Sequence, residues 1–592
     1  MCGIAGIYSL DGSKIPNLES RVKQMTKMIK YRGPDNVGYY FNKKNSFGMA
    51  NNQLSIVSPD KKIKLPFSYN NKTFLSFNGE IYNYNALKDK FKITEKNFKN
   101  KTDIEVLYHI LNLKIKDLSN LNGIWSFAFY NNEEHSLQLS RDLLGERNLY
   151  FYKNKKELIF CSEIRPIFSA NNINFSIDNV GLQDMWNYYA CRDNKTIIDN
   201  CFKLKPGITK IFFNNTYRDF NHSKLEIEKW VEFLKQNNEK KISDKFVEIF
   251  QEEANLRYPK KVKSITLLSG GIDSSLTSLY LGKNNKLKTL YAISHDANYL
   301  KRNGISDMDL SLEISKIIKS NHLFVDLREN FMELALRQSE NTIETIDPAM
   351  LNFAQLSKLI RRKDLKVVIG SDGPDEFLCG YNRDVNNYLN NKKTSFLKIP
   401  YHKIINPKSY YKKIFNKVEN ETDYFSKPDE RYSSLIKNLD ITQIKALTYA
   451  TKSVPEYINM RLDKSYMLNS LEMRQPFLSK RIVELLCSMP KKFKINKKKK
   501  LGKYYLRSLI KKNKKLSQYP KVGFGINLNY NDKVASKMKN LMNETIEDKK
   551  IYTKIGMKLD ARNLFLSDKI HKGQKYMLFS LIRSLNNLKK ST

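Results

Sequence analysis

A glycine-rich turn near the middle of the chain constrains the fold more than any other segment. Residues 262–268 are rich in apolar and β-branched side chains, and they run directly into Ser269-Gly270-Gly271-Ile272-Asp273-Ser274-Ser275 and then into the largely apolar stretch 276–281. This order predicts a buried strand, a tight turn and a helix. The two glycines let consecutive backbone N–H groups face a phosphate, and the helix N-terminus adds the positive end of its dipole. The turn is therefore predicted to bind phosphate, with an ordinary strand-to-helix connection as the alternative. No Gly-x-x-x-x-Gly-Lys-[Ser/Thr] motif occurs here, which excludes a Walker-type loop.

An acid-rich turn follows a second predicted strand. Residues 366–369 read as this buried strand, and Gly370-Ser371-Asp372-Gly373-Pro374-Asp375-Glu376 comes at its C-terminal end. Ligand sites in open α/β sheets lie outside the carboxyl ends of the strands. Asp273 and Asp375 are suited to hold Mg²⁺ together, because this ion takes only one or two protein carboxylates beside phosphate oxygens and water. A solvated turn is the alternative, but the mostly apolar run 377–381 favours a packed region.

The chain opens Met1-Cys2-Gly3, which points to a different chemistry. Methionine aminopeptidase removes Met1 when the next side chain is small. The thiol of Cys2 then lies beside a free α-amine whose pKa of about 8 suits it to shuttle a proton. The alternative interpretation is a buried, inert cysteine. The catalytic interpretation is favoured only if the other residues of an amide-cleaving site occur later in the sequence.

The rest of such a site does follow in the sequence. Arg32-Gly33-Pro34-Asp35 marks a tight turn. The run 76–83 contains Asn78 and Gly79, whose side-chain amide and backbone N–H are suited to form an oxyanion hole, and the glycine lets the backbone approach a ligand closely. Asp103 offers a carboxylate for the ammonium group of a substrate. Each segment alone is a turn or a satisfied polar residue.

Together with Cys2, these segments resemble the glutaminase domain of class II glutamine amidotransferases over about the first 200 residues. The resemblance implies an Ntn-type α+β domain of sandwiched antiparallel sheets that binds and hydrolyses glutamine. It implies catalytic roles for Cys2, Asn78 and Gly79. The positions that match the glutamine-binding residues of the family are Gln53, Leu54, Ile56, Val57, Asn78, Gly79, Glu80 and Asp103.

One position departs from the family pattern. In the family an Arg precedes the Leu-Ser-Ile-Val segment and pairs with the α-carboxylate of glutamine, whereas this chain has Gln53 there. A charge-assisted pair is roughly twice as strong as a neutral hydrogen bond, so glutamine binding is predicted to be weaker by about 1–2 kcal/mol. Arg32 from a neighbouring turn is an alternative partner for the carboxylate. The family's Pro before Leu-Tyr is also replaced, by Asn148.

The second half of the chain resembles another family. The glycine-rich turn looks like the pyrophosphate loop of ATP pyrophosphatases, which cleave ATP between its α- and β-phosphates and adenylate an acceptor. Three further runs are similar to the synthetase domain of asparagine synthetases: 470–478 with its Glu-x-Arg-x-Pro-Phe-Leu pattern, Lys503 to Arg507, and Lys521 to Phe524. The family's Ser-Gly before the acid appears here as Gly370-Ser371.

This second resemblance implies ATP and Mg²⁺ as cofactors. It implies catalytic roles for Asp372, near the adenylation centre, and for Lys503, which supports the charge that develops on phosphate. The metal ligands it implies are Asp273 and Asp375. The ATP-binding positions are Leu268, Ser269, Gly270, Gly271, Asp273, Ser274, Ser275, Ile293, Gly370 and Ser371.

These anchors divide the chain into two domains. Residues 1–205 are predicted to form the glutaminase, 206–240 a linker, and 241–592 a doubly wound α/β domain with a parallel sheet and helical additions. Residues 391–440, rich in Lys, Asn and Tyr, are predicted to be an insertion or a helical lid. The pocket for the acceptor is formed by segments such as 344–355, to which the sequence assigns no roles.

Composition fits a large soluble enzyme. The chain has 592 residues, of which 41% are hydrophobic, and this predicts two or three domains. No apolar run approaches the ~18 residues of a membrane span and the start lacks a signal-peptide core, so a cytoplasmic location without a membrane partner is expected. The six cysteines form no Cys-x-x-Cys pair and the seven histidines no His-x-x-x-His pair, so any metal is predicted to be Mg²⁺ bound with ATP. A homodimer is compatible with the sequence.

The net charge of +42 supports a competing hypothesis. A basic protein with an adenylating loop could bind RNA or modify tRNA. The densest clusters of lysines are 497–500 and 511–515. The basic residues are nevertheless spread along the chain, and Lys outnumbers Arg. This pattern is typical of a general compositional bias, so no dedicated nucleic-acid partner is predicted. A catalytically dead relative is disfavoured because Cys2, Asn78, Asp273 and Asp375 are all present.

The sequence thus predicts a glutamine-dependent, ATP-consuming ligase that makes an amide. Cys2 releases ammonia from glutamine, and ATP activates a carboxylate as an acyl-adenylate that ammonia attacks, with AMP and pyrophosphate as products. The resemblance implies that ammonia travels inside the protein. Aspartate is the default acceptor, which gives asparagine. Another carboxylate, such as a sugar uronic acid, is the alternative.

Overall fold

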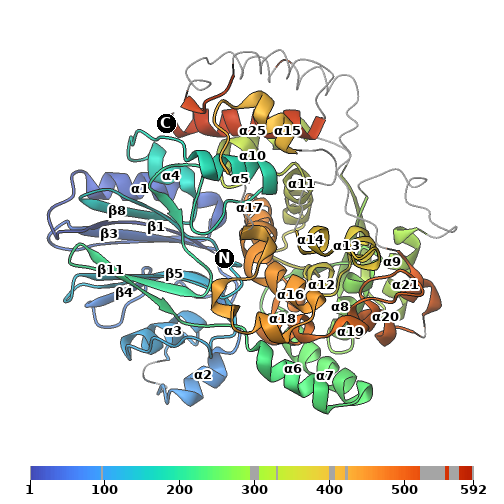
Figure 1. Ribbon diagram of the computed structural model, residues 1–592. Coiled ribbons are helices and arrows are strands. Elements are labelled where there is room, and N and C mark those ends of the chain that lie inside the picture. The colour runs from blue at the N-terminus through green and yellow to red at the C-terminus, as the bar shows by residue number, and fades with distance from the viewer. Residues whose placement is uncertain are drawn as a thin grey trace.

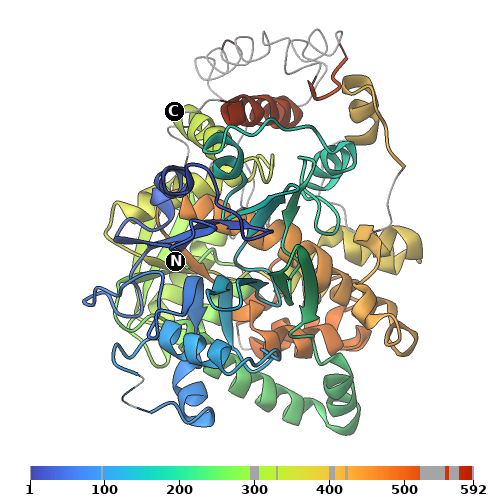
Figure 2. The same cartoon turned by 90° about the vertical axis from the view of Figure 1, so that its left-hand side faces the viewer.

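The computed structural model describes residues 2–94, 96, 98–293, 306–327, 331–398, 407–420, 424–511, 513–520, 540, 554–558 and 572–589. The predicted turn from Lys521 to Phe524 lies outside these residues. Figures 1 and 2 show the N-terminal part as two stacked sheets beside a larger body of helices that surround a third sheet. Within the described ranges, no helix has both the length and the apolar character that a membrane span requires.

The N-terminal part is a sandwich of two antiparallel sheets. The six-stranded sheet has the order β2 (Asn36–Phe41), β3 (Phe47–Gln53), β1 (Cys2–Ser9), β8 (Glu157–Cys161), β7 (Tyr150–Lys153) and β9 (Cys201–Lys203). The five-stranded sheet has the order β11 (Thr216–Asn221), β10 (Ile208–Phe213), β6 (Ser136–Arg141), β5 (Gly123–Asn131) and β4 (Thr73–Ile81). The predicted α+β sandwich is confirmed.

Both faces of β5 are buried, which explains why this strand is apolar along its whole length. Ala128 and Tyr130 pack between the two sheets, where Tyr130 stacks on Phe47 with ring centroids 3.7 Å apart. Trp125 and Phe127 point the other way, into the core beneath α3 (Asp103–Asn112) and α2 (Tyr84–Lys90). On the opposite side of the sandwich, α1 (Leu18–Met28), α4 (Ile164–Ser169) and α5 (Asn179–Tyr188) cover the six-stranded sheet.

The third sheet is parallel, as predicted. Its order is β14 (Asn321–Asp326), β13 (Lys288–Ile293), β12 (Ser264–Leu267), β15 (Val367–Ile369) and β16 (Glu472–Arg474). The first strand, β12, is central: the next two strands lie on one side of it, and the last two lie on the other. The strand order therefore reverses between β12 and β15, which is where doubly wound sheets bind ligands.

Helices make up most of the remaining described structure. They are η1 (Lys30–Arg32), α6 (Ile227–Gln236), α7 (Glu239–Arg257), α8 (Ile272–Gly282), α9 (Asp307–Ile317), α10 (Phe331–Asn341), α11 (Met350–Arg361), α12 (Pro374–Phe377), α13 (Asn382–Leu389), α14 (Lys393–Leu397), α15 (Pro407–Ile414), η4 (Tyr424–Ser426), η5 (Glu430–Tyr432), η6 (Ile436–Asn438), α16 (Ile441–Thr448), the π-helix η7 (Tyr449–Ile458), α17 (Asn459–Met467), η8 (Pro476–Leu478), α18 (Lys480–Ser488), α19 (Lys491–Lys494), α20 (Tyr504–Leu509), α21 (Lys514–Gln518) and α25 (Lys572–Lys589).

The glutaminase sheet extends beyond the boundary predicted at residue 205. Strand β10 pairs with β6, and β11 pairs with β10 and ends at Asn221. The stretch 206–240, predicted to be a linker, therefore holds two strands of the sandwich and the helix α6.

The two parts of the chain share one hydrophobic core. The last described helix, α25, packs against α4 of the sandwich and against α10. Within 391–440, α15 packs against α5, and the rings of Phe415 and Trp186 lie 5.6 Å apart. Side chains from both ends of the sequence, such as Ile7 and Ile582, belong to this single cluster. The sandwich is therefore covered by helices that the second half of the chain supplies.

This shared core predicts a large cost for truncating a side chain of α25. Ile582 has no exposed surface, so Ile582→Ala should lower the free energy of unfolding by about 2–5 kcal/mol, because it leaves a cavity. Urea titration of the full chain measures this loss. Leu113→Ala is the control, since Leu113 is 57% exposed and its truncation should change stability little. Equal effects of the two substitutions would contradict a shared core.

Candidate active sites

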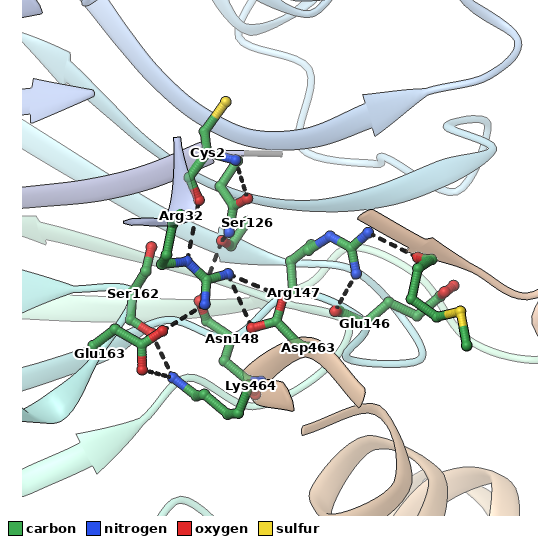
Figure 3. A network of polar contacts seen from close by, with 12 residues as sticks. Cys2, Arg32, Ser126, Glu146, Arg147, Asn148, Ser162, Glu163, Asp463 and Lys464 are labelled. Carbon is green, nitrogen blue, oxygen red and sulfur yellow. Dashed lines mark hydrogen bonds and ion pairs between the residues drawn. The ribbon is translucent and has the colours of Figure 1, made fainter. Parts of the chain in front are cut away.

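Cys2 is the first residue of β1 and lies inside the sandwich (Figure 3). Its backbone nitrogen donates to Oδ1 of Asn78, 3.0 Å away on β4, and its carbonyl oxygen accepts a hydrogen bond of 3.3 Å from Nε of Arg32. The backbone N–H of Leu54 hydrogen-bonds the thiol. All three polar parts of the residue are therefore held in place.

The thiol of Cys2 needs a base before it can act as a nucleophile. Burial raises its pKa above the ordinary value, although the N-terminal amine and the Leu54 N–H act in the opposite direction. Once Met1 is removed, the nitrogen that Asn78 holds becomes the α-amine of the chain. In that form the predicted base and the predicted nucleophile belong to the same residue, and Asn78 accepts a hydrogen bond from the nitrogen.

Asn78 and Gly79 have more specific surroundings than the sequence indicated. The side-chain nitrogen of Asn78 faces Oγ of Ser126 at 3.5 Å, while its oxygen holds Cys2. Gly79 has a φ of 154°, and a Cβ there would come within 2.0 Å of the carbonyl oxygen of Ile124. The sequence suggested that this glycine makes room for a ligand, but the neighbouring strand β5 is what requires it.

Gln53 lies directly beside the nucleophile, because it pairs with Cys2 in the register of β1 and β3. Its Oε1 accepts a hydrogen bond of 3.3 Å from Asn36. The apolar neighbours predicted with it are Leu54 and Ile56, both buried, and Val57, which is half-buried. Asp103, at the start of α3, accepts a hydrogen bond of 3.0 Å from the N–H of Ile81, and burial raises its pKa to about 6.

Arg32 is not available to bind glutamine. It is completely buried, and its donors are shared among Cys2, Glu163 and Asp463. Its Nη1 lies 2.5 Å from Glu163, and its Nη2 lies 2.9 Å from both carboxylate oxygens of Asp463. The alternative in which Arg32 pairs with the carboxylate of glutamine is therefore wrong for this structure.

Glu80, predicted to bind glutamine, pairs with Arg474 of β16. Burial raises the pKa of Glu80 to about 8, even though Arg474 acts to lower it. Arg474 also lies 2.6 Å from Glu472, whose pKa falls to about 2 because the N-terminal amine, Arg474 and Arg147 outweigh the effect of burial. This cluster joins β4 of the sandwich to the parallel sheet.

The predicted phosphate turn lies where the order of the parallel strands reverses. Gly270, between β12 and α8, has a φ of 77°, and a Cβ there would come within 2.0 Å of the carbonyl oxygen of Asp307. Ser269 and Ser274 join their hydroxyls at 3.0 Å, which closes the turn at the N-terminus of α8. Leu268 directly follows β12, and Ile293 is the last residue of the neighbouring strand β13. The turn precedes the N-terminus of α8, as an anion site requires, but the N–H groups of Ser269 and Gly271 donate to hydroxyls within the turn, at 3.2 and 3.4 Å.

Three predicted residues from distant segments converge beside this turn. Nζ of Lys503 lies 2.7 Å from Oδ2 of Asp273 and 2.7 Å from Oδ1 of Asp375. The two carboxylates thus share one cation position, which here is an ammonium group. The arrangement fits Mg²⁺, which uses one or two carboxylates and takes its other ligands from phosphate and water. Among the described residues, no group of three or more His, Cys, Asp or Glu is placed to hold a metal.

Asp372 is held by a residue that the sequence did not single out. Gln475 accepts a hydrogen bond of 2.9 Å from the backbone N–H of Asp372 and donates one of 2.8 Å to its carboxylate. A Cβ on Gly370 would come within 2.6 Å of the same amide. The reversed Gly370-Ser371 pair was the available signal, because the glycine makes room for Gln475. Ser371 instead donates to Oγ1 of Thr277 on α8, 2.9 Å away.

Comparison with known proteins matches each part of the chain to a family model. A family model described as asparagine synthase matches residues 245–575, and one described as a glutamine amidotransferase domain matches residues 1–223. The chain belongs to the asparagine synthase family. It is therefore a glutamine-hydrolysing amidotransferase and ligase of a family that uses ATP, and glutamine is the amide donor of its N-terminal domain class.

Several curated proteins are similar over most of the chain. Asparagine synthetase (glutamine-hydrolyzing) 1 of Bacillus subtilis (strain 168) is 25% identical over 555 residues, which cover 86% of this chain and 84% of that protein. Asparagine synthetase (glutamine-hydrolyzing) 3 of the same organism is 24% identical, and the match covers 88% of this chain and 87% of that protein. Amidase chry2 of Gibberella zeae is 23% identical over 64% of this chain and 59% of its own length.

The position of Gln53 predicts the outcome of restoring a guanidinium there. Gln53→Arg should lower the KM for glutamine by about tenfold, which corresponds to one charge-assisted pair, without much change in kcat. The substrate carboxylate is remote from the reacting amide, so it is bound equally in the ground and transition states. Steady-state glutamine hydrolysis measures both constants. Gln53→Lys is the control, because it adds the charge without a planar fork and should lower KM less. An unchanged or higher KM in Gln53→Arg would show that Gln53 does not limit glutamine capture.

Proposed function

We propose that this enzyme converts aspartate to asparagine through an acyl-adenylate, with glutamine as the ammonia donor. The observation that carries the proposal is the meeting of Asp273, Asp375 and Lys503 beside the phosphate turn at the switch point of the parallel sheet. These groups suit a reaction in which pyrophosphate is the leaving group. The family match supports amide synthesis, and the relatives named asparagine synthetase support aspartate as the acceptor.

The first half-reaction takes place at Cys2. The α-amine accepts the thiol proton, and the thiolate attacks the side-chain carbonyl carbon of glutamine. The C–N bond then breaks and ammonia leaves with a proton from the amine, which gives a γ-glutamyl thioester. Water hydrolyses the thioester to glutamate and restores the thiol. Donors near Asn78 and Gly79 would stabilise the oxyanion of each tetrahedral intermediate.

The second half-reaction takes place at the switch point. A carboxylate oxygen of the acceptor attacks the α-phosphorus of ATP, the bond to the β-phosphate bridge breaks, and pyrophosphate leaves. Mg²⁺ held by Asp273 and Asp375 would neutralise phosphate charge there. Lys503 supplies a fixed positive charge between the two acids. Ammonia then attacks the acyl carbon of the adenylate, which yields the amide and AMP.

Charged groups of both signs surround the segment 344–355, where the acceptor is expected to bind. Arg461 of α17 donates to the hydroxyl of Tyr457 at 2.9 Å and lies 3.6 Å from Asp347. Its electrostatic neighbours also include Asp372. Aspartate carries an ammonium group as well as carboxylates, so it complements this mixture. A uronic acid carries only the carboxylate, which makes it the second candidate.

One assay tests the acceptor directly. Ammonium chloride replaces glutamine, ATP is supplied, and the release of AMP is measured with aspartate, glutamate and glucuronate in separate reactions. The proposal expects AMP and asparagine in equal amounts with aspartate and little AMP with the other two. AMP formation with glucuronate and none with aspartate would establish the alternative acceptor.

Cys2→Ala should abolish glutamine hydrolysis and leave ammonia-dependent synthesis within about twofold of wild type, because the nucleophile serves only the first half-reaction. Glutamate release and amide formation from ammonium chloride are measured on the same preparation. Cys379→Ala is the matched control, since Cys379 is also buried but lies in the second domain. Glutaminase activity that persists in Cys2→Ala would contradict the assignment.

Asp375→Asn should remove ATP-dependent chemistry and spare glutamine hydrolysis. The substitution leaves Lys503 with one carboxylate and strips a metal ligand from the leaving pyrophosphate. We expect the rate of AMP formation from α-labelled ATP to fall by at least about a hundredfold, and the same for Asp273→Asn. Asp364→Asn, which removes an exposed ion pair with Lys263, is the control and should leave the rate of AMP formation unchanged. AMP formation at the wild-type rate in Asp375→Asn would rule out the metal role.

A further inference from the structure

The nucleophile end of β1 lacks a strand partner on one side. The pairing of β1 with β8 begins at Ala5, whereas its pairing with β3 begins at Cys2. Side chains take the place of the missing strand. Arg32 donates to the carbonyl oxygen of Cys2, and the hydroxyl of Ser162 accepts from the N–H of Ile4 at 3.1 Å. On this side of β1 the carbonyl oxygen of Cys2 is held by Arg32, so its position depends there on what fixes Arg32.

Arg32 is fixed by one carboxylate from each domain. Its Nη2 bonds both oxygens of Asp463 on α17, and neither side chain has any exposed surface. Glu163, at the start of α4, takes Nη1 and also pairs with Lys464, the next residue of α17 (Figure 3). Asp463 is thus the only described carboxylate from the synthetase half that an ion pair joins to Arg32.

A second chain of hydrogen bonds leads from Cys2 to the same part of the synthetase domain. Asn78 holds the nitrogen of Cys2 and faces Ser126, whose hydroxyl lies 3.4 Å from the carbonyl oxygen of Asn148. The Asn148 side chain accepts from Arg141 at 2.7 Å. Arg141 in turn donates to the carbonyl oxygen of Pro455 at 3.0 Å. Pro455 belongs to the π-helix η7, which runs directly into α17.

The segment formed by η7 and α17, residues 449–467, is therefore linked to both ends of the Cys2 backbone, through Arg32 at the carbonyl oxygen and through Arg141 and Asn78 at the nitrogen. The same segment carries Tyr457 and Arg461, which contact Asp347 in the region where the acceptor is expected. We propose that Asp463 is a positioning residue for the glutaminase: through Arg32 it sets the carbonyl, and thus the thiol, of Cys2. This inference rests on the proposed role of Cys2 as the nucleophile.

A merely structural role would give a different signature. Removing one partner of a buried ion pair between the domains destabilises the protein, because the other charge is left unpaired. A purely structural role therefore predicts similar losses for any such pair, whatever its distance from Cys2. A positioning role instead predicts a loss confined to the chemical step at Cys2, because displacing a reacting group by about 1 Å costs up to ~100-fold in rate. Glu456 provides the comparison. It also lies in η7 and forms a buried ion pair with Lys203 of the sandwich, but it makes no described contact with Cys2.

The experiment compares Asp463→Asn with Glu456→Gln in the full chain. Each removes one buried negative charge from the same helical segment. We expect Asp463→Asn to lower kcat for glutamine hydrolysis by at least about tenfold with KM within about twofold. Ammonia-dependent synthesis should stay near the wild-type rate in both variants. Glu456→Gln should leave the glutaminase constants unchanged. Equal losses in both variants, or no loss in Asp463→Asn, would overturn the proposal.

Arg32→Lys guards against a variant that fails to fold. Lysine keeps a positive charge between Glu163 and Asp463 but has no Nε donor for Cys2. The same selective fall in kcat is expected, and a wild-type kcat would overturn the proposal. The wild-type enzyme is assayed first. If it releases no glutamate from glutamine, the proposed function fails and this inference fails with it. If the wild-type enzyme does release glutamate, the kcat values of the variants alone test the role of Asp463.

Discussion

Two buried guanidinium groups fix how the halves of this enzyme meet. Arg32 of the sandwich reaches Asp463, and Arg474 of the parallel sheet reaches Glu80. Removing such groups from water costs several kcal/mol each unless nearly every donor finds an acceptor in good geometry. In this structure the relative placement of the two domains brings a carboxylate of the opposite domain to each of these groups. The ion pairs therefore determine how the two domains are oriented, while burial of the shared apolar core stabilises their association.

The local motifs could be predicted from sequence because their chemistry is contained in a few consecutive residues. The phosphate turn at 269–275 and the acid turn at 370–376 lie at the carboxyl ends of β12 and β15, as the strand-turn order indicated. The pairing of Asp273 with Asp375 also follows from that rule. Family resemblance then supplied Lys503, which only its spacing to Leu506 and Arg507 distinguishes from the many other lysines.

The contacts between domains could not be predicted in this way. Glu80 and Arg474 are separated by 394 residues, and Arg32 and Asp463 by 431, so no spacing rule connects them. Gln475 fills space over Gly370, which only the folded arrangement reveals. The predicted end of the sandwich at residue 205 left out β10, although Ile208, Ile211 and Phe212 in that strand are apolar, and β11, which is largely exposed. A strand without apolar alternation gives no periodic signal.

The helix α25 has a consequence for how the protein is made. It is the last described helix of the chain, yet it packs against α4 of the N-terminal sandwich. Synthesis on the ribosome proceeds from the N-terminus, so the face of α4 that contacts α25 stays uncovered until α25 has been made, whereas α5 is covered earlier, by α15. An incomplete chain therefore cannot finish the core that surrounds the glutaminase. A glutaminase domain made without the second half of the chain would expose this apolar face to water.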